Sequence, residues 1–157
     1  MNLFKYILIV ISLVFHQVYA EEKLTCEGMK EKIQSVCKRA ISGEAKAMYN
    51  LGLMYDEGEG QPGNKPDYKE ALKWYTKAAD AGYVEAMSNL GWMYYKGEGQ
   101  PESKPNYEKA IKWYTKAADA GNAKAMSNLG VMNEFGEGQP GNKPNFQEAI
   151  KWYKKAA

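Results

Sequence analysis

The chain of 157 residues carries the stretch AMYNLG at residues 47–52 and repeats it as AMSNLG at 86–91 and 125–130. A second stretch keeps the same spacing of 39 residues, with ALKWY at 71–75 and AIKWY at 110–114 and 149–153. A period of about 20 to 50 residues is typical of stacked arrays, in which each unit buries its apolar face against a neighbour. The repeat therefore predicts an array that presents a surface to a partner rather than a reaction centre.

Each copy predicts two helices. In the first copy Ala47, Leu51 and Tyr55 fall every four residues, so they share one helical face, and a glycine closes this run. Residues 59–66 are dense in Gly and Pro and predict a loop. Apolar residues then resume with helical spacing up to the glycine at residue 82. Small residues opposite large ones let the two helices approach closely, so we expect an antiparallel helix hairpin.

The second helix of each copy opens with a residue that suits an N-cap, namely Asp67, Asn106 or Asn145. Glu70 and Glu148 lie three residues further on, which predicts a capping box in the first and third copies.

One more helix is expected before the repeats, over residues 29–42, and its polar outer face suits a terminal cap. The expected organisation is an all-α chain of seven helices. It comprises a capping segment at 21–43 and repeats at 44–82, 83–121 and 122–157. The sequence stops within the second helix of the third copy. Either another molecule covers that end, as in a homo-oligomer, or the chain is a shortened relative of a longer array.

Residues 1–20 have the three-part pattern of a secretory signal peptide: a positive start at Lys5, an apolar run, and small residues that allow cleavage after Ala20. The apolar run of about ten residues is too short to span a bilayer, so no membrane span is expected after cleavage. The prediction is a secreted or periplasmic protein, and the alternative is an uncleaved N-terminal anchor.

Cleavage would remove His16, the only histidine, and Lys5, which leaves 20 basic residues against 19 acidic ones. A net charge near +1 gives no electrostatic argument for nucleic acid or an anionic membrane as partner. Without histidine, no metal site is expected, and no cofactor is expected either.

Cys26 and Cys37 are the only cysteines, and an even pair in an exported chain suggests a disulfide. One helix carrying both would hold them about 16 Å apart, too far for a bond. Gly28 could let the preceding segment fold back and close that gap. An internal bridge, an intermolecular bridge and free thiols all remain open.

The run from Ala47 to Gly60, followed by residues 67–79, resembles the Sel1-like repeat family, which is related to the tetratricopeptide repeat. The resemblance covers residues 44–157 three times over. It implies a right-handed α-solenoid that serves as a protein-interaction scaffold, often in exported bacterial proteins. The family's variable, concave positions would bind the protein or peptide partner. They fall on Tyr49, Asn50, Leu53, Asp56 and Glu57 in the first copy, Ser88, Asn89, Trp92, Tyr95 and Lys96 in the second, and Ser127, Asn128, Val131, Glu134 and Phe135 in the third.

Among these, Asn50, Asn89 and Asn128 form a row of side-chain amides. An amide donates and accepts hydrogen bonds, so the row could hold the backbone of an extended peptide without reading its sequence. Alternatively, each asparagine bonds a neighbouring helix within the array.

Trp92 stands where the other copies hold Leu53 and Val131, so it is expected to face a ligand, with Tyr95 and Tyr49 as further aromatic anchors. The tryptophans that recur in every copy are instead expected to be packing residues. These are Trp74, Trp113 and Trp152.

Catalytic signals are weak, and no catalytic residue is assigned. Ser35 and Lys38 fit the Ser-x-x-Lys pattern of penicillin-recognising enzymes, but no Ser-Asp-Asn or Lys-Thr-Gly partner exists. A cysteine-rich branch of the resembled family is described as β-lactam-binding or β-lactamase-like, and this chain lacks that branch's cysteine pairs. Because of that branch, a β-lactam-binding or β-lactamase-like protein is kept as the alternative to a scaffold. A binder of cell-wall carbohydrate that uses the many tyrosines is a third hypothesis.

Overall fold

The computed structural model describes Cys26 and residues 31–157, and within these it contains helices, short 3-10 turns and loops but no strand. The predicted signal peptide at 1–20 and the fold-back at Gly28 lie outside the described residues. The α-helices, in chain order, are α2 (Glu31–Ile41), α3 (Ala45–Glu57), α4 (Tyr68–Asp80), α5 (Val84–Lys96), α6 (Tyr107–Asp119), α7 (Ala123–Phe135) and α8 (Phe146–Ala156).

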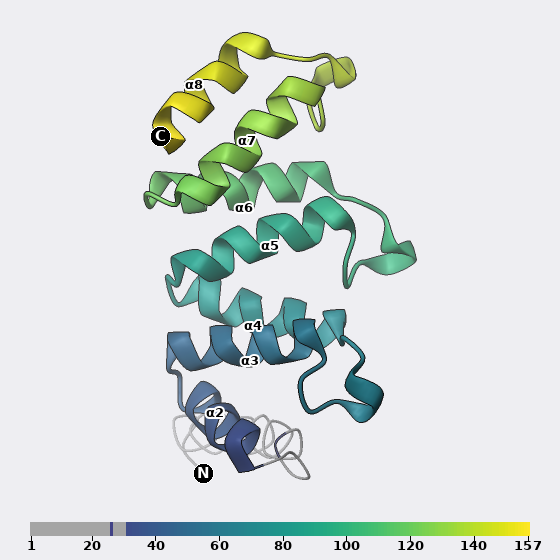
Figure 1. Ribbon diagram of the computed structural model, residues 1–157, viewed down its shortest axis with the longest axis vertical. Helices are drawn as coiled ribbons and strands as arrows, with labels where there is room; N and C mark the ends of the chain where they lie inside the picture. Colours follow the sequence, from purple (N-terminus) through teal and green to yellow (C-terminus); the bar gives the residue numbers. More distant parts are fainter. Residues whose placement is uncertain (1–25, 27–30) are drawn as a thin grey trace, which may run out of the picture.

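The helices stack in sequence order as three hairpins, α3 with α4, α5 with α6 and α7 with α8 (Figure 1). Helix α2 packs on α3, while α4 contacts α5 and α6 contacts α7, so each hairpin rests on the next. The first helices of the second and third hairpins, α5 and α7, also touch each other. This arrangement confirms the predicted all-α solenoid of helix hairpins.

Glycines end the first helix of every hairpin. Gly58, Gly97 and Gly136 take φ values of 74°, 78° and 74°, a conformation that costs glycine little. A Cβ atom on Gly58 would lie 2.6 Å from the carbonyl oxygen of Asn64, so the chain that follows folds tightly back over the helix end. The predicted loops then each contain one 3-10 turn, at Pro62–Asn64, Pro101–Ser103 and Pro140–Asn142.

The N-caps of the second helices form as predicted. The side chains of Asp67, Asn106 and Asn145 each accept a hydrogen bond from the backbone N–H three residues later, at 3.1, 3.0 and 3.1 Å. These bonds satisfy donors that the helix itself leaves free.

The predicted capping boxes are wrong. In a capping box the carboxylate accepts the N–H of the N-cap residue, but Asp67 already donates its N–H to the carbonyl of Tyr55 at 2.8 Å. Glu70 instead pairs with Lys73 at 3.3 Å. The third hairpin repeats the pattern, with Glu148 paired to Lys151 at 2.9 Å. The hairpin contact therefore takes the donor that the local motif would use.

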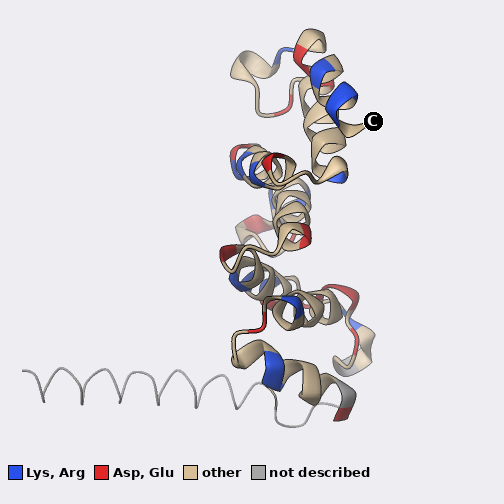
Figure 2. Cartoon of the chain, turned by 90° about the vertical axis from the view of Figure 1, so that its left-hand side faces the viewer, with Lys and Arg blue, Asp and Glu red and all other residues tan. Residues whose placement is uncertain are grey.

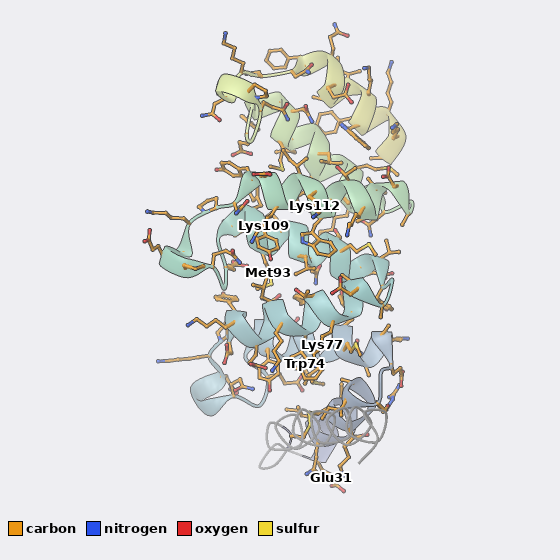
Figure 3. All side chains as sticks on the ribbon, turned by 180° about the vertical axis from the view of Figure 1, so that it is seen from behind. Glu31, Trp74, Lys77, Met93, Lys109 and Lys112 are labelled. Atoms are coloured by element: carbon orange, nitrogen blue, oxygen red, sulfur yellow. A yellow bond between two sulfur atoms is a disulfide. The ribbon has the colours of Figure 1, made fainter. Side chains whose placement is uncertain are left out.

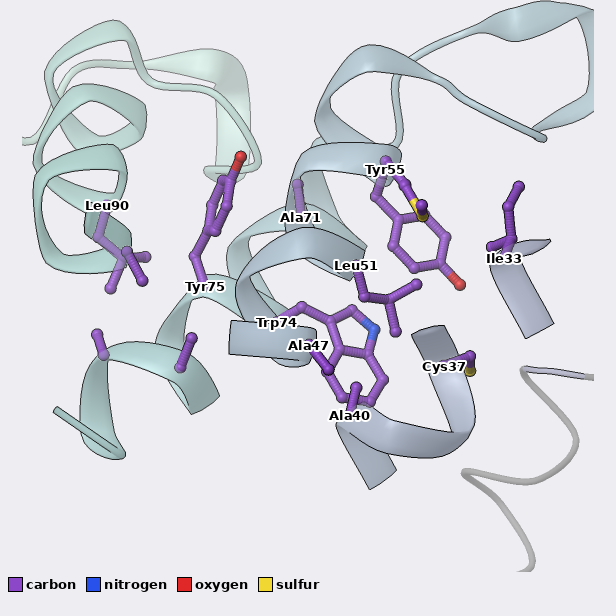
Figure 4. Close-up of a cluster of buried hydrophobic side chains, with 14 of the residues drawn as sticks. Ile33, Cys37, Ala40, Ala47, Leu51, Tyr55, Ala71, Trp74, Tyr75 and Leu90 are labelled. Atoms are coloured by element: carbon purple, nitrogen blue, oxygen red, sulfur yellow. The ribbon is translucent and has the colours of Figure 1, made fainter. Parts of the chain in front are cut away.

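The core runs between the helices of each hairpin and into the next hairpin. Figure 4 shows Leu51, Tyr55 and Trp74 packed beside Ile33 and Cys37 of α2, and all of these side chains are buried. The small residues predicted to face large ones, Gly52 and Ala71, are both buried, and Gly52 lies against the ring of Tyr75.

Asn133 occupies the core position that Tyr55 and Tyr94 hold in the other copies. It is buried, and its side-chain amide donates to the carbonyl of Leu129 at 2.8 Å. This bond satisfies a polar group that would otherwise be costly inside the fold.

Cys26 and Cys37 are joined by a disulfide, with their Cα atoms 5.9 Å apart. This distance is far shorter than the roughly 16 Å that one regular helix would impose, so the two cysteines do not sit on one continuous straight helix. Both cysteines are buried. The bond therefore fastens Cys26 to the core at this end of the stack.

The recurrent tryptophans are packing residues that also support lysines. Trp74 is fully buried, while Trp113 and Trp152 are half-buried. In each case the lysine three residues later lies over the indole, at 4.7, 4.4 and 4.3 Å from the ring centroid. Lys77 can be seen beside Trp74 in Figure 3.

Basic and acidic residues are interspersed along the stack (Figure 2), in keeping with the near balance of charges in the sequence. None of the helices that the structure describes is long and apolar enough to cross a membrane.

Candidate binding groove

Two adjoining pockets lie along the first helices of the hairpins. The first, which we call the Asp56 pocket, has a volume of about 270 Å³ and is lined by Asp56, Asn89, Trp92, Lys124 and Asn128. The second, which we call the Tyr114 pocket, has a volume of about 370 Å³ and is lined by Trp92, Tyr95, Lys96, Tyr114, Asn128, Val131 and Met132. Trp92 and Asn128 border both pockets, so the two form one groove across α3, α5 and α7.

Trp92 is the dominant side chain of the groove. Its ring is stacked on that of Tyr95, with centroids 5.8 Å apart and planes at 26°, and the side chain is 43% exposed. The Lys96 ammonium lies 5.6 Å from the indole centroid. Residues three and four apart share a helix face, so α5 presents an aromatic pair and one cation together.

Seven of the predicted concave-face residues line this groove: Asp56, Asn89, Trp92, Tyr95, Lys96, Asn128 and Val131. The structure thus brings together residues that are as far apart as 75 positions in sequence, from 56 to 131. Tyr49, Asn50, Leu53, Ser127 and Glu134 line neither pocket, and neither do Glu57 and Phe135.

The prediction that Ser88 offers itself to a partner is wrong, since this residue is 3% exposed. Its short side chain stays beneath the surface of α5. Tyr49, at the same position of α3, is larger and half-buried, and its ring packs against Tyr75 and Tyr83 at 5.7 and 4.9 Å. Tyr49 is therefore largely a packing residue.

Three groove residues were missed in the sequence. Lys124 lies four residues before Asn128, so helical spacing alone places both on one face of α7 and could have identified it. Tyr114 and Met132 gave no such signal, because their counterparts Tyr75 and Met93 are core residues. Tyr114 reaches the groove from α6, the second helix of the middle hairpin, whereas the other lining residues belong to first helices.

In two hairpins a tyrosine of the second helix bonds an acid of the first helix. The Tyr75 hydroxyl donates to Asp56 Oδ2 at 3.2 Å, and the Tyr153 hydroxyl donates to Glu134 Oε2 at 2.6 Å. Both pairs join residues 19 positions apart. Burial raises the pKa of Asp56, although the hydrogen bond from Tyr75 acts in the opposite direction. These two acids are thus already engaged within the protein.

Two asparagines of the row, Asn89 and Asn128, lie beside tyrosine hydroxyls of the protein itself, so their amides are only partly available to a partner. Burial raises the pKa of Tyr75, and the Asn89 amide, which lies beside that hydroxyl, acts in the opposite direction. Asn128 has the same relation to Tyr114. Both alternatives considered for the row are therefore compatible with the geometry of Asn89 and Asn128, which face internal tyrosines and also line the groove.

A third pocket, of about 460 Å³, lies between the first two loops and includes Lys65, Tyr68, Lys69, Gly99 and Gln100. It is larger than either groove pocket but contains none of the predicted site residues.

Ser35 and Lys38 are exposed on α2 and line none of these three pockets. The β-lactam alternative stays a prediction. Within the described part of the chain, no group of three His, Cys, Asp or Glu side chains is placed to hold a metal ion.

All three repeats match a known family of protein repeats. The model of the Sel1 repeat matches residues 45–83, 84–122 and 123–157, so each matched copy begins one residue later than the boundary expected from the sequence. No curated protein matches the chain significantly.

Two solved structures are similar. A Sel1 repeat protein from Oxalobacter formigenes is 42% identical over 74% of this chain and 44% of its own, with a TM-score of 0.63. A protective antigen present in uropathogenic Escherichia coli strains, which displays an SLR fold, is 39% identical over 79% of this chain and 25% of its own, with a TM-score of 0.68. The chain therefore spans less than half of the length of either protein.

Proposed function

Because the chain belongs to the Sel1 repeat family, we propose that it is an exported scaffold whose groove across α3, α5 and α7 binds an extended segment of a partner protein. Sel1 repeat proteins generally serve as protein-interaction scaffolds. The observation that carries the choice of surface is the 43% exposure of Trp92 at the junction of the two pockets. Exposed aromatic side chains bordering a hollow are typical anchors of protein interfaces.

The polar residues of the groove suit a peptide backbone. Asn89 and Asn128 offer amides on successive first helices, and Lys124 adds a cation beside them. An extended segment that crosses α3, α5 and α7 would place its carbonyl and amide groups against these side chains while one apolar residue covers Trp92.

Export is supported by two features. Residues 1–20 have the pattern of a cleavable signal peptide, with cleavage expected after Ala20. The disulfide between Cys26 and Cys37 is a bond that persists in oxidising compartments such as the bacterial periplasm or the cell exterior. Secretion or periplasmic localisation would be tested by fractionating cells and determining the N-terminal residue of the exported protein, expected to be Glu21.

Selection from a displayed library of random decapeptides on the immobilised protein tests the groove. The wild-type protein is expected to enrich related peptides. Asn89→Ala combined with Trp92→Ala should weaken the binding of the enriched peptides by about 30-fold or more, since an aromatic anchor contributes about 2 kcal/mol. Lys112→Ala, on the exposed face of α6 and outside the pockets, is the control and should bind normally. No enrichment, or equal binding by the double variant, would overturn the proposal.

A further inference from the structure

The middle hairpin breaks a pattern that its neighbours share. In the first and third hairpins the hydroxyl of Tyr75 or Tyr153 donates a hydrogen bond to an acid 19 residues earlier, Asp56 or Glu134. Tyr114 is the corresponding tyrosine of the middle hairpin, and the residue 19 positions before it is Tyr95. Tyr95 does not replace the acid: its hydroxyl donates to Glu137 at 3.2 Å, and the Tyr114 hydroxyl makes no hydrogen bond to it.

Tyr114 is consequently left with an unused hydroxyl. This side chain is 1% exposed, and in the described part of the chain its oxygen has no hydrogen-bond partner. The side-chain nitrogen of Asn128 is buried beside this hydroxyl and, against the larger effect of burial, lowers the Tyr114 pKa, as a donor would, but neither group finds an acceptor within hydrogen-bond geometry among the described residues. Buried polar atoms without partners cost free energy. In the described chain Trp74, Ser88 and Glu137 also carry one each, but Tyr114 and Asn128 are the two that line a pocket open to a ligand.

The Tyr114 pocket has an excess of donors. Burial raises the pKa of Tyr114, so at neutral pH its hydroxyl keeps its proton and can donate. Asn128 contributes N–H groups and Lys96 contributes the only charge among the lining residues. Glu137 is the nearby acid: its Oε1 accepts from the Tyr95 hydroxyl and its Oε2 is buried without a partner among the described residues, but Glu137 does not line the pocket. A ligand for this pocket must therefore be an acceptor, and Lys96 favours a negative one.

We infer that the Tyr114 pocket takes the carboxylate of an Asp or Glu side chain of the partner peptide, which supplies from outside the acceptor that Asp56 and Glu134 supply within the other two hairpins. The inference rests on the proposed function of the groove and names the chemistry of its ligand. Trp92 and Tyr95 would cover the aliphatic part of the acidic side chain.

The decapeptide selection tests this inference directly. Enriched sequences should share Asp or Glu at one aligned position. The best sequence is then synthesised with both ends blocked, in its acidic form and with that residue changed to the matching amide, and binding is measured by calorimetry. The wild-type protein should bind the acidic form about 10-fold more tightly.

Three variants identify the groups responsible. Tyr114→Phe removes only the hydroxyl and should bring the preference for the acidic peptide to within about twofold. Tyr75→Phe, the control, removes a hydroxyl that already has an internal acceptor and should keep the preference. Tyr95→Asp restores the acid found in the other hairpins and should weaken binding of the acidic peptide by about 10-fold or more. This variant tests the inference independently of whether Tyr114→Phe folds.

The possible failures are distinct. If no peptide is enriched, the proposed function falls and the inference falls with it. If peptides are enriched without a shared acid, or if Tyr114→Phe keeps the preference, the inference is overturned while the groove stands. Tighter binding of a peptide that offers only a free C-terminal carboxylate would also overturn it.

Discussion

Gly52 of α3 lies against the ring of Tyr75 of α4, so closely that a Cβ atom on the glycine would stand 2.6 Å from Cδ1 of the tyrosine. Gly91 and Tyr114 repeat this contact in the second hairpin at 2.4 Å. Real Cβ contacts are longer, so only glycine lets the two helices close over the ring. The same glycine that opens room for the tyrosine therefore also fixes where its hydroxyl emerges, at the acid of the first hairpin or in the Tyr114 pocket of the second.

Gly91→Ala is expected to destabilise the protein by about 1–3 kcal/mol, because the added methyl meets a ring that is buried on all sides. Gly130→Ala is the matched comparison. It creates the same clash with Tyr153, but that ring is 36% exposed and can shift, so its cost should be clearly smaller. Urea unfolding followed by circular dichroism measures both. Equal costs would show that the buried ring can move as readily as the exposed one.

Tyr75→Phe and Tyr114→Phe should differ in stability although they delete the same atom. The first removes a hydrogen bond to the Asp56 carboxylate and should cost about 1–3 kcal/mol. The second removes a hydroxyl without a partner among the described residues and should cost less than about 0.5 kcal/mol, or even stabilise. Thermal unfolding of the two variants beside the wild type decides the matter. A loss in Tyr114→Phe as large as in Tyr75→Phe would mean that this hydroxyl is bonded after all.

Reduction of the disulfide should destabilise the N-terminal end selectively. Closing a loop of 11 residues restricts the unfolded chain by about 2–3 kcal/mol. In a linear array a loss at one end weakens with distance. After reduction, amide hydrogen exchange should accelerate in α2 and α3 and change little in α7. The chain has two cysteines, both in this bond, so a reducing agent acts on no other site. Uniform acceleration along the stack would contradict nearest-neighbour behaviour.

The carboxyl of Glu98 should favour folding at low pH, whereas an acid in a salt bridge favours folding at high pH. Burial first, and the nearby Asp56 second, raise its pKa above the ordinary 4.5. The folded state therefore holds the proton more strongly than the unfolded state. This contribution favours folding at low pH and is lost as pH rises through the raised pKa.

Glu98→Gln should consequently stabilise the protein at about pH 7, by less than about 1 kcal/mol because solvent screens this carboxyl. The gain should vanish at about pH 3, where the carboxyl is protonated in both states. Urea unfolding at the two pH values provides the measurement. A gain that persists unchanged at low pH would exclude a charge effect.

Local signals in the sequence were sufficient for the helices and their order. The glycines at the helix ends and the N-caps at Asp67, Asn106 and Asn145 act within a few residues of the positions they determine, and the period of 39 residues repeats these signals in every copy. The capping boxes failed for the complementary reason, since the N–H of Asp67 is taken by Tyr55 in the preceding helix. The resemblance to the Sel1-like repeat also implied that residues of successive first helices would share one face, and Asn89, Trp92 and Asn128 line one pocket.

The sequence by itself determined that this chain forms stacked helix hairpins, because the preference for a helix, its ends and its buried face are properties of neighbouring residues. Only the tertiary structure decided which polar groups remain without a partner. Tyr75, Tyr114 and Tyr153 occupy equivalent positions in near-identical stretches, yet their hydroxyls end in different surroundings. The reason is that each tyrosine hydroxyl extends from its own helix toward another. Its acceptor therefore depends on which side chains of neighbouring helices come together once the hairpins pack.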